Sequence, residues 1–262
     1  AGAADVANFS QLQLGNAYFY NALNVGQIHQ GVELEAKARP FANLRLRGML
    51  SLGNWKYKGN ANFNIIDVLS NQEVPGATGT INIKDLKVGD AAQITASLGA
   101  SYEVVERLKV DANYRYVDKL YAAIDPTAFS KENNKGSLEL PSFGLVDTGL
   151  SYKMLVGKDK SKSLNFRFNM NNLLNHIFLS ELSTSQIVAT ENEFETSTGN
   201  GLINPLGSTT SASNRLKGTN ANQFATYQDY TSRGINENGL DVRNQGYYGL
   251  GRTWNFTIRY NF

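Results

Sequence analysis

The feature that most constrains this chain is a strict alternation of apolar and polar residues, which recurs in segments as far as the last residue. In the last segment Trp254, Phe256, Ile258 and Tyr260 are separated by single polar residues. Successive side chains of a β-strand point to opposite faces, so a period of two predicts strands with one apolar and one polar face. A helix would instead need apolar residues every three or four positions. The chain is therefore expected to be all-β.

The same alternation predicts about seven strands that are long enough to cross a membrane. Their ranges are 31–39, 44–57, 91–104, 107–121, 143–155, 163–173 and 250–262. A spanning strand needs about 9–11 residues, whereas a strand of a soluble sandwich averages about 5–6. The lengths favour a membrane barrel over a soluble sandwich.

The connections between the predicted strands are alternately short and long. The long connections, 58–90, 122–141 and 174–247, are polar and rich in Gly, Asn, Ser and Thr. In outer-membrane barrels the periplasmic turns are short and the outer loops are long. We therefore predict an antiparallel transmembrane β-barrel with these three loops on its outer side.

Seven strands are too few to close a barrel around a wide lumen. An open sheet would leave unpaired backbone groups in hydrocarbon, which is costly. We therefore interpret the chain as the C-terminal portion of a larger barrel whose remaining strands come from elsewhere.

Charge and composition exclude several other classes of protein. Lys and Arg total 25 against 23 for Asp and Glu, with no long run of one sign, so we expect no nucleic-acid partner. Cysteine is absent, which excludes disulfides and thiolate metal sites. No stretch approaches the roughly 20 apolar residues of a membrane-spanning helix.

Catalytic and cofactor motifs are also missing from the sequence. The two histidines, His29 and His176, lack the paired spacing of a zinc site. No phosphate-binding glycine loop, Ser-His-Asp order or nucleophile elbow is present. We predict no enzyme activity, no cofactor and no metal site.

Several segments resemble elements of TonB-dependent receptors. The segment 172–178 (NLLNHIF) resembles their Asn-Leu-Phe-Asn-x-x-Tyr element, which Asn172, Leu173 and Asn175 match. The ending 251–262 is similar to their last strand and begins with Gly251-Arg252, where the family commonly has a proline before the arginine. Segments 31–35 and 140–143 resemble two earlier elements, and the loops resemble those of Bacteroidetes-type receptors.

The resemblance implies a 22-stranded barrel in the outer membrane of a Gram-negative bacterium. Its partners would be the remaining N-terminal barrel strands and the plug domain of the same receptor, the lipid bilayer, TonB, which the N-terminal part contacts, and a surface lipoprotein. Such a receptor imports a scarce nutrient: a siderophore, haem, cobalamin, a glycan or a peptide. The alternatives are a passive porin or structural barrel, and a soluble carbohydrate-binding or adhesive β-domain.

A few aromatic residues are candidates for function. Trp55 and Tyr57 share the face of the arginines on the same strand, so they are predicted to line the outer mouth of the lumen, where they bind ligand or pack against the plug. Tyr121 is a third candidate for ligand binding. By the resemblance, Tyr260 and Phe262 form the signal that the barrel assembly machinery reads; the alternative is an ordinary aromatic girdle.

Overall fold

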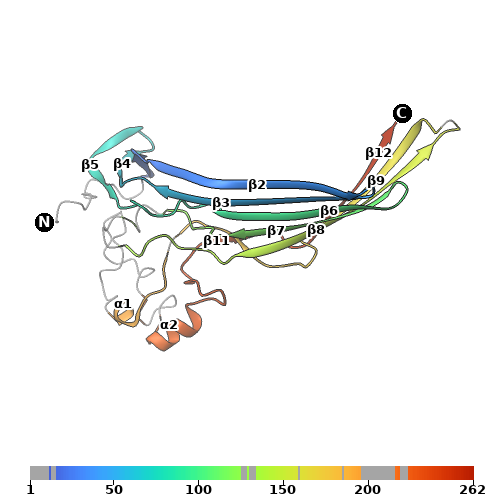
Figure 1. Cartoon of the computed structure of the whole chain (residues 1–262). Coiled ribbons are helices and arrows are strands. Elements are labelled where there is room, and N and C mark those ends of the chain that lie inside the picture. Colours follow the sequence, from blue (N-terminus) through green and yellow to red (C-terminus); the bar gives the residue numbers. More distant parts are fainter. Residues whose placement is uncertain are drawn as a thin grey trace.

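The computed structural model describes residues 12, 16–124, 129, 134–158, 160–184, 186–195, 216–218 and 224–262. Its largest element is a seven-stranded antiparallel sheet in the order β12-β9-β8-β7-β6-β3-β2. The strands are long and gently curved, and smaller elements gather at one end of the sheet (Figure 1). This architecture confirms the predicted all-β, antiparallel class.

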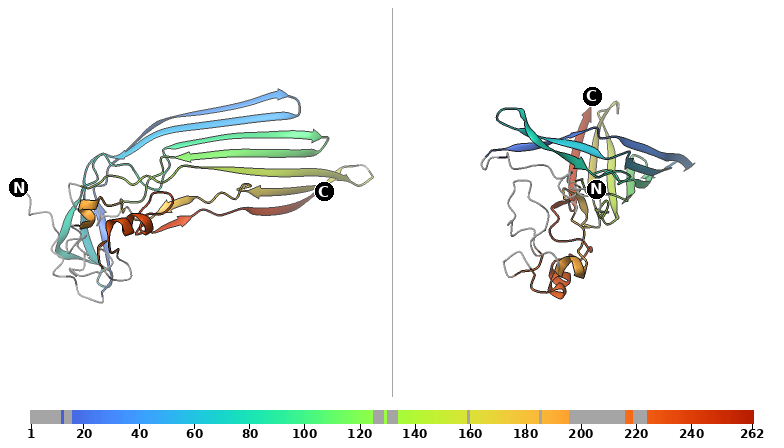
Figure 2. Two further views of the ribbon diagram at one scale, coloured as in Figure 1. Left: turned by 90° about the horizontal axis from the view of Figure 1, so that it is seen from below. Right: turned by 90° about the vertical axis from the view of Figure 1, so that its left-hand side faces the viewer.

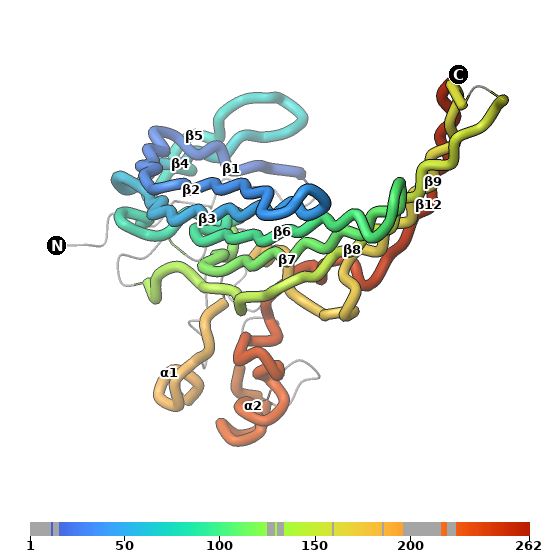
Figure 3. Tube along the Cα trace, turned by 45° about the vertical axis from the view of Figure 1, so that its right-hand side comes forward, coloured from blue at the N-terminus to red at the C-terminus, as the bar shows by residue number. Residues whose placement is uncertain are grey.

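The seven strands lie side by side with short turns at one end and long connections at the other (Figure 2, left). Two-residue turns join the two strands of the first hairpin, at 42–43, and those of the second, at 106–107. The sheet twists along its length, so β9 and β12 run at an angle to β2 and β3 (Figure 3). The strands are β2 (Gln27–Phe41), β3 (Leu44–Tyr57), β6 (Ile94–Val105), β7 (Leu108–Asp118), β8 (Phe143–Val156), β9 (Lys162–Asn171) and β12 (Thr253–Asn261).

The register of the sheet places apolar side chains of neighbouring strands next to one another on the same face. On the β9–β12 pair, Phe168 faces Phe256 and Phe166 faces Ile258. The apolar face is open: Leu98 is 65% exposed and Ile258 is 57% exposed, so no part of the described chain covers it. A continuous exposed apolar face of this kind needs a lipid or protein cover.

Several strands begin or end away from the predicted ranges. β2 starts at Gln27 rather than at residue 31, and β6 starts at Ile94 rather than at residue 91. β7 ends before Lys119 and β9 ends before Asn172, because these two residues have positive φ angles of 52° and 48°. A left-handed residue turns the chain out of the ladder, and side-chain alternation alone does not detect it.

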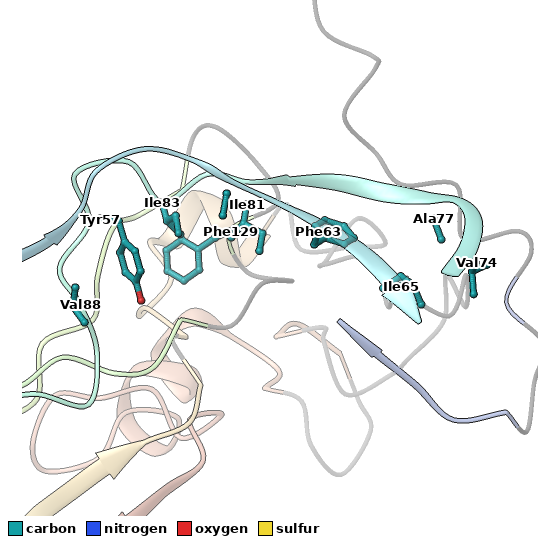
Figure 4. Close-up of a cluster of buried hydrophobic side chains, with 10 residues drawn as sticks. Tyr57, Phe63, Ile65, Val74, Ala77, Ile81, Ile83, Val88 and Phe129 are labelled. Atoms are coloured by element: carbon teal, nitrogen blue, oxygen red, sulfur yellow. The ribbon is translucent and has the colours of Figure 1, made fainter. Parts of the chain in front are cut away.

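The predicted loop 58–90 is largely β structure, which is a correction. It contains β4 (Ala61–Asp67) and β5 (Gln72–Ile81), and these form a three-stranded sheet with β1 (Tyr18–Leu23). Phe63 and Ile65 point from β4 into a buried cluster with Phe129 (Figure 4). The sequence pattern did not predict this sheet, because its strands pair with no spanning strand and one of them, β1, lies far upstream of the β4–β5 hairpin.

The predicted loop 174–247 also contains regular structure where it is described. β10 (Leu179–Leu182) pairs with β11 (Gly246–Tyr248), and α1 (Glu191–Glu195) and α2 (Tyr227–Arg233) lie between them. A second buried cluster joins this segment to the loop 122–141 through Leu120, Leu140, Leu179 and Leu182. Residues 125–128, 130–133, 185, 196–215 and 219–223 of the predicted loops lie outside the described residues.

The open apolar face gives a direct test of membrane exposure. Ile258→Arg places a cation on the apolar face of β12, whereas Thr257→Arg places the same cation on the polar face. In the assembled barrel the first change is expected to destabilise folding by about 2–4 kcal/mol if the site lies near the bilayer midplane, and the second by much less. Urea unfolding in lipid bilayers measures both; equal effects would contradict the assignment of faces.

Candidate functional site

The polar face of the sheet is held by ion pairs that reach across strands. Arg167 on β9 donates two hydrogen bonds to Asp111 on β7, at 2.8 and 3.0 Å, and so crosses over β8. The residue between them is Gly149, where an added Cβ would lie 2.6 Å from Arg167 Nη2 and 2.7 Å from Asp111 Oδ2. The missing side chain is what lets the arginine lie flat against the wall.

A second glycine on the polar face accommodates another arginine. A Cβ at Gly99 would lie 2.6 Å from Arg47 Nε and 3.0 Å from Asn113 Oδ1. Arg115 pairs with Asp147 at 3.0 Å in the same region. The polar face is therefore a continuous charged wall rather than a set of isolated surface residues.

One part of this wall is hollowed and strongly basic. A hollow of about 580 Å³ is lined by five cationic side chains and one carboxylate, namely Lys37, Arg39, Arg45, Arg47, Arg167 and Asp111. We call it the basic hollow. It borders the 42–43 turn, so it lies at the end of the sheet opposite the long loops.

The candidate ligand residue Trp55 lies at the other end of the polar face. Its ring stacks on His29, with centroids 5.3 Å apart and planes at 23°. Buried Gln93 fixes its backbone, because the side-chain amide donates to the Trp55 carbonyl at 2.8 Å and accepts from the Trp55 amide at 3.2 Å. This stacking was not predicted from the sequence, although the two residues lie opposite each other in the β2–β3 register.

Tyr57 and Tyr121 are more buried than the sequence suggested. Tyr57 is 9% exposed and belongs to the cluster beneath β4 and β5, close to Phe129 (Figure 4). Tyr121 is 6% exposed. Burial, together with the neighbouring carboxylate of Glu139, raises the pKa of Tyr121 to about 12. The structure brings Trp55 and Tyr57 to the same end of β3, where the partly buried Trp55 packs against the cluster that buries Tyr57.

Asn172 links the end of β9 to β8 and to the segment between β11 and β12, at the point where the wall meets its longest outer connection. Its amide N–H donates to Asp147 on β8 at 3.0 Å. Its side chain accepts from the amide of His176 at 2.8 Å and donates to the carbonyls of His176, at 2.8 Å, and Leu250, at 3.2 Å. At 3% exposed, it is a buried polar clamp.

The other motif residues complete this junction. Asn175 accepts from the backbone amide of Arg252 at 2.9 Å, and the backbone amide of Leu173 donates to the carbonyl of Val146 at 2.7 Å. Asparagine suits both turn positions because Asn172 and Asn175 have positive φ angles. These residues therefore interrupt the β9–β12 pair and hold the start and end of the outer segment together.

The outer segment contains a buried polar network that the sequence analysis did not identify. Tyr230 on α2 is 0% exposed and donates to Asp241 at 2.7 Å, and Arg243 binds the same carboxylate at 2.8 and 2.6 Å. Asp241 falls in the predicted polar loop 174–247, but it is only 1% exposed. Tyr230 also belongs to a buried hydrophobic cluster with Phe194 and Leu216.

Neither metal ligation nor a helical membrane span is found in the described part of the chain. No group of three or more His, Cys, Asp or Glu residues is arranged to hold a metal ion there. No described helix is long and apolar enough to cross a membrane.

Comparison with protein families decides the identity of this wall. Residues 4–173 match the family described as TonB dependent receptor-like, beta-barrel, which is more than half of the 262 residues. The chain belongs to this family. No curated protein matches it at a significant level.

Membership of the TonB-dependent receptor family confirms the predicted barrel class and the resemblance. The family consists of outer-membrane receptors and transporters rather than enzymes, and its complete members carry a plug domain and contact TonB. The sheet of this receptor chain is not closed, because β2 and β12 do not pair with each other. The Bacteroidetes-type origin stays a prediction.

The match to the receptor family ends inside the motif. Asn172 and Leu173 fall within the matched residues, whereas Asn175, Arg252, Tyr260 and Phe262 lie beyond them. Tyr260 and Phe262 have ring centroids 5.9 Å apart, and Phe262 is 95% exposed. Their role as an assembly signal stays a prediction.

Removing the Asn172 side chain should loosen the junction between the receptor wall and its outer segment. Asn172→Gly keeps the turn conformation and loses the three side-chain hydrogen bonds, at an expected cost of about 1–3 kcal/mol. Asn172→Ala should cost about 1 kcal/mol more, because alanine disfavours a positive φ. The check is faster amide hydrogen exchange at His176 in the assembled receptor.

The matched control for this junction is Asn171→Ala, because exposed Asn171 makes one 3.3 Å side-chain bond to Thr253. In the Asn171→Ala receptor, the rate of amide hydrogen exchange at His176 should match that of the unmodified receptor. Equal exchange in all three variants would contradict the clamp.

The outer network should respond to alkaline pH. Burial and the bond to Asp241 raise the pKa of Tyr230 to about 12, above the ordinary value near 10. Its contribution to stability is therefore complete below about pH 10 and is lost as the pH rises towards about 12. In a titration of tyrosinate absorbance, Tyr230→Phe should remove one ionisation near pH 12 and leave that of Tyr121. The control Tyr247→Phe, at an exposed position, should keep both ionisations near pH 12. If both also persist in Tyr230→Phe, the assignment of one of them to Tyr230 is refuted.

Proposed function

We propose that this chain forms the closing wall and outer loops of a TonB-dependent outer-membrane transporter, one that takes up a scarce nutrient through a barrel of 22 strands. The observation that carries the proposal is the seven-stranded sheet with an uncovered apolar face and a charged polar face. A bilayer would cover the first face, and an aqueous, domain-filled interior would satisfy the second.

The arrangement of the ends supports a role in ligand capture. The long connections of the wall lie at one end, where β1, β4 and β5 and the α1–α2 segment are packed on buried clusters. A preorganised loop loses less conformational entropy on binding than a disordered one. These loops are therefore suited to hold a ligand above the barrel before it passes inward.

Within this function, Trp55 is proposed as the ligand-contacting residue of the wall. Its ring is partly exposed and already stacked on His29, so a flat ligand could extend the stack. Tyr57 and Tyr121 are both buried, so they would support the residues around the outer mouth of the lumen rather than contact the ligand. Tyr260 and Phe262 keep their proposed role in assembly.

Energy coupling separates this function from that of a passive porin. Cells carrying the intact receptor should take up the nutrient only with an active TonB and a proton gradient, while surface binding should persist without either. The measurement is growth of a receptor-deletion strain and of the same strain complemented with the receptor, each with and without active TonB. Iron siderophores, haem, cobalamin, glycans and peptides serve in turn as the limiting nutrient.

Channel conductance supplies the control. The purified intact receptor should be closed in planar bilayers, because a plug fills its lumen. An open channel at rest, together with uptake that does not need TonB, would establish the porin function instead.

A further inference from the structure

The short connection between β8 and β9 is rich in lysine. Lys158, Lys160 and Lys162 alternate along it, and all three residues are exposed. Among the described residues, none of these three ammonium groups takes part in an ion pair or a hydrogen bond. Asp159, the one acidic residue between them, lies outside the described residues, and a single carboxylate cannot neutralise three cations. The connection therefore carries a net positive charge.

The other two short turns of the wall carry no such excess of positive charge. Arg107 in one of them pairs with Glu106 at 2.5 Å, and the turn at 42–43 contains no charged residue. The β8–β9 hairpin also extends farther from the long loops than the other two hairpins (Figure 2, left). The lysines are therefore a particular feature of this hairpin rather than a general property of the turns.

The register of the sheet places Lys162 on the apolar face. Lys162 lies opposite Val156, so the two side chains share a face. Leu164, opposite Met154, continues this face along the strands, and Tyr260 lies on the other side of Leu164. A cation on the lipid-facing side of a barrel is costly near the midplane and tolerated near the interface. Lys162 therefore lies at the membrane boundary, where its long side chain can reach the headgroups.

Aromatic rings mark the same boundary. Tyr260 and Phe262 are both exposed, and their ring centroids are 5.9 Å apart. Aromatic girdles flank the apolar band of outer-membrane barrels at both interfaces, and the short turns face the periplasm. Lys158 and Lys160 follow the boundary residue into the turn, so they meet the headgroup layer of the periplasmic leaflet. That leaflet consists of phospholipids, some of which are anionic.

We propose that Lys158, Lys160 and Lys162 bind the phosphate of an anionic phospholipid of the periplasmic leaflet, with its acyl chains along the apolar face of β8 and β9. Two observations carry this inference: the uncompensated charge of the turn, and its continuity with the uncovered apolar face. Each lysine at an anionic membrane surface is expected to strengthen binding by a factor of about five. The inference needs only a wall that spans the outer membrane, so it does not rest on nutrient uptake.

A fluorescent label in the turn of the intact receptor tests the site. This chain contains no cysteine, so Ser161→Cys provides one labelling position in it, with any cysteine elsewhere in the receptor replaced by serine. The labelled receptor is placed in phosphatidylcholine vesicles that contain a lipid with a nitroxide high on its acyl chain. Nitroxide-labelled phosphatidylglycerol should quench the label at a mole fraction at least about tenfold lower than nitroxide-labelled phosphatidylcholine.

Charge removal shows whether the lysines cause this preference. In Lys158→Gln/Lys160→Gln/Lys162→Gln the two quenching lipids should become equivalent. The matched control removes three exposed lysines at the loop end of the wall and should keep the preference. Its substitutions are Lys58→Gln, Lys84→Gln and Lys119→Gln. Heat-modifiable gel migration verifies that each barrel is folded.

Three outcomes would overturn the proposal. The first is equal quenching by the two lipids in the receptor with all its lysines, and the second is a preference that survives removal of Lys158, Lys160 and Lys162. The third distinguishes a lipid from free phosphate. If inorganic phosphate alone protects these lysines from acetylation as strongly as phosphatidylglycerol vesicles do, the turn is a site for a small anion. None of these outcomes bears on TonB-dependent uptake, which is measured separately.

Discussion

The two-residue period of the strands, locked in register across seven of them, is the constraint on which the rest of this structure depends. A slip of one residue would carry every apolar side chain to the polar face. The observed register instead places Phe166 opposite Ile258 and Arg167 opposite Thr257, so the two faces keep opposite characters to the last strand. Membrane exposure, lumenal charge and loop placement all follow from this separation.

On the polar face, glycine and arginine act together. Arginine is long enough to reach a carboxylate two strands away, but only if the intervening strand offers no side chain. Gly149 meets this requirement beneath the Arg167–Asp111 pair. Gly99 likewise leaves room for the side chain of Arg47. The result is a flat charged wall that leaves room for whatever fills the lumen, with unpaired charge concentrated in the basic hollow.

The wall and the outer structure meet at the Asn172 junction. There the β9–β12 ladder stops and is resumed by β10 and β11 after a bend held by asparagine side chains. Asp147 takes part on both sides, because it binds Arg115 on the wall and the amide of Asn172. The segment 172–178, which resembles an element of the family, is thus a structural joint, and it accounts for the fixed entry and exit of the outer segment.

The sequence by itself determined the antiparallel class, the two faces of the spanning strands and the family, because side-chain alternation and short motifs are local properties of the chain. Only the tertiary structure decided that the region 58–90 forms a sheet with β1, that Trp55 stacks on His29, and that Tyr230, Asp241 and Arg243 form a buried network. It also decided which lumenal arginines are paired. These features depend on side-chain burial and pairing between strands and across turns, where the gain outweighs local preference and leaves no periodic signal to read.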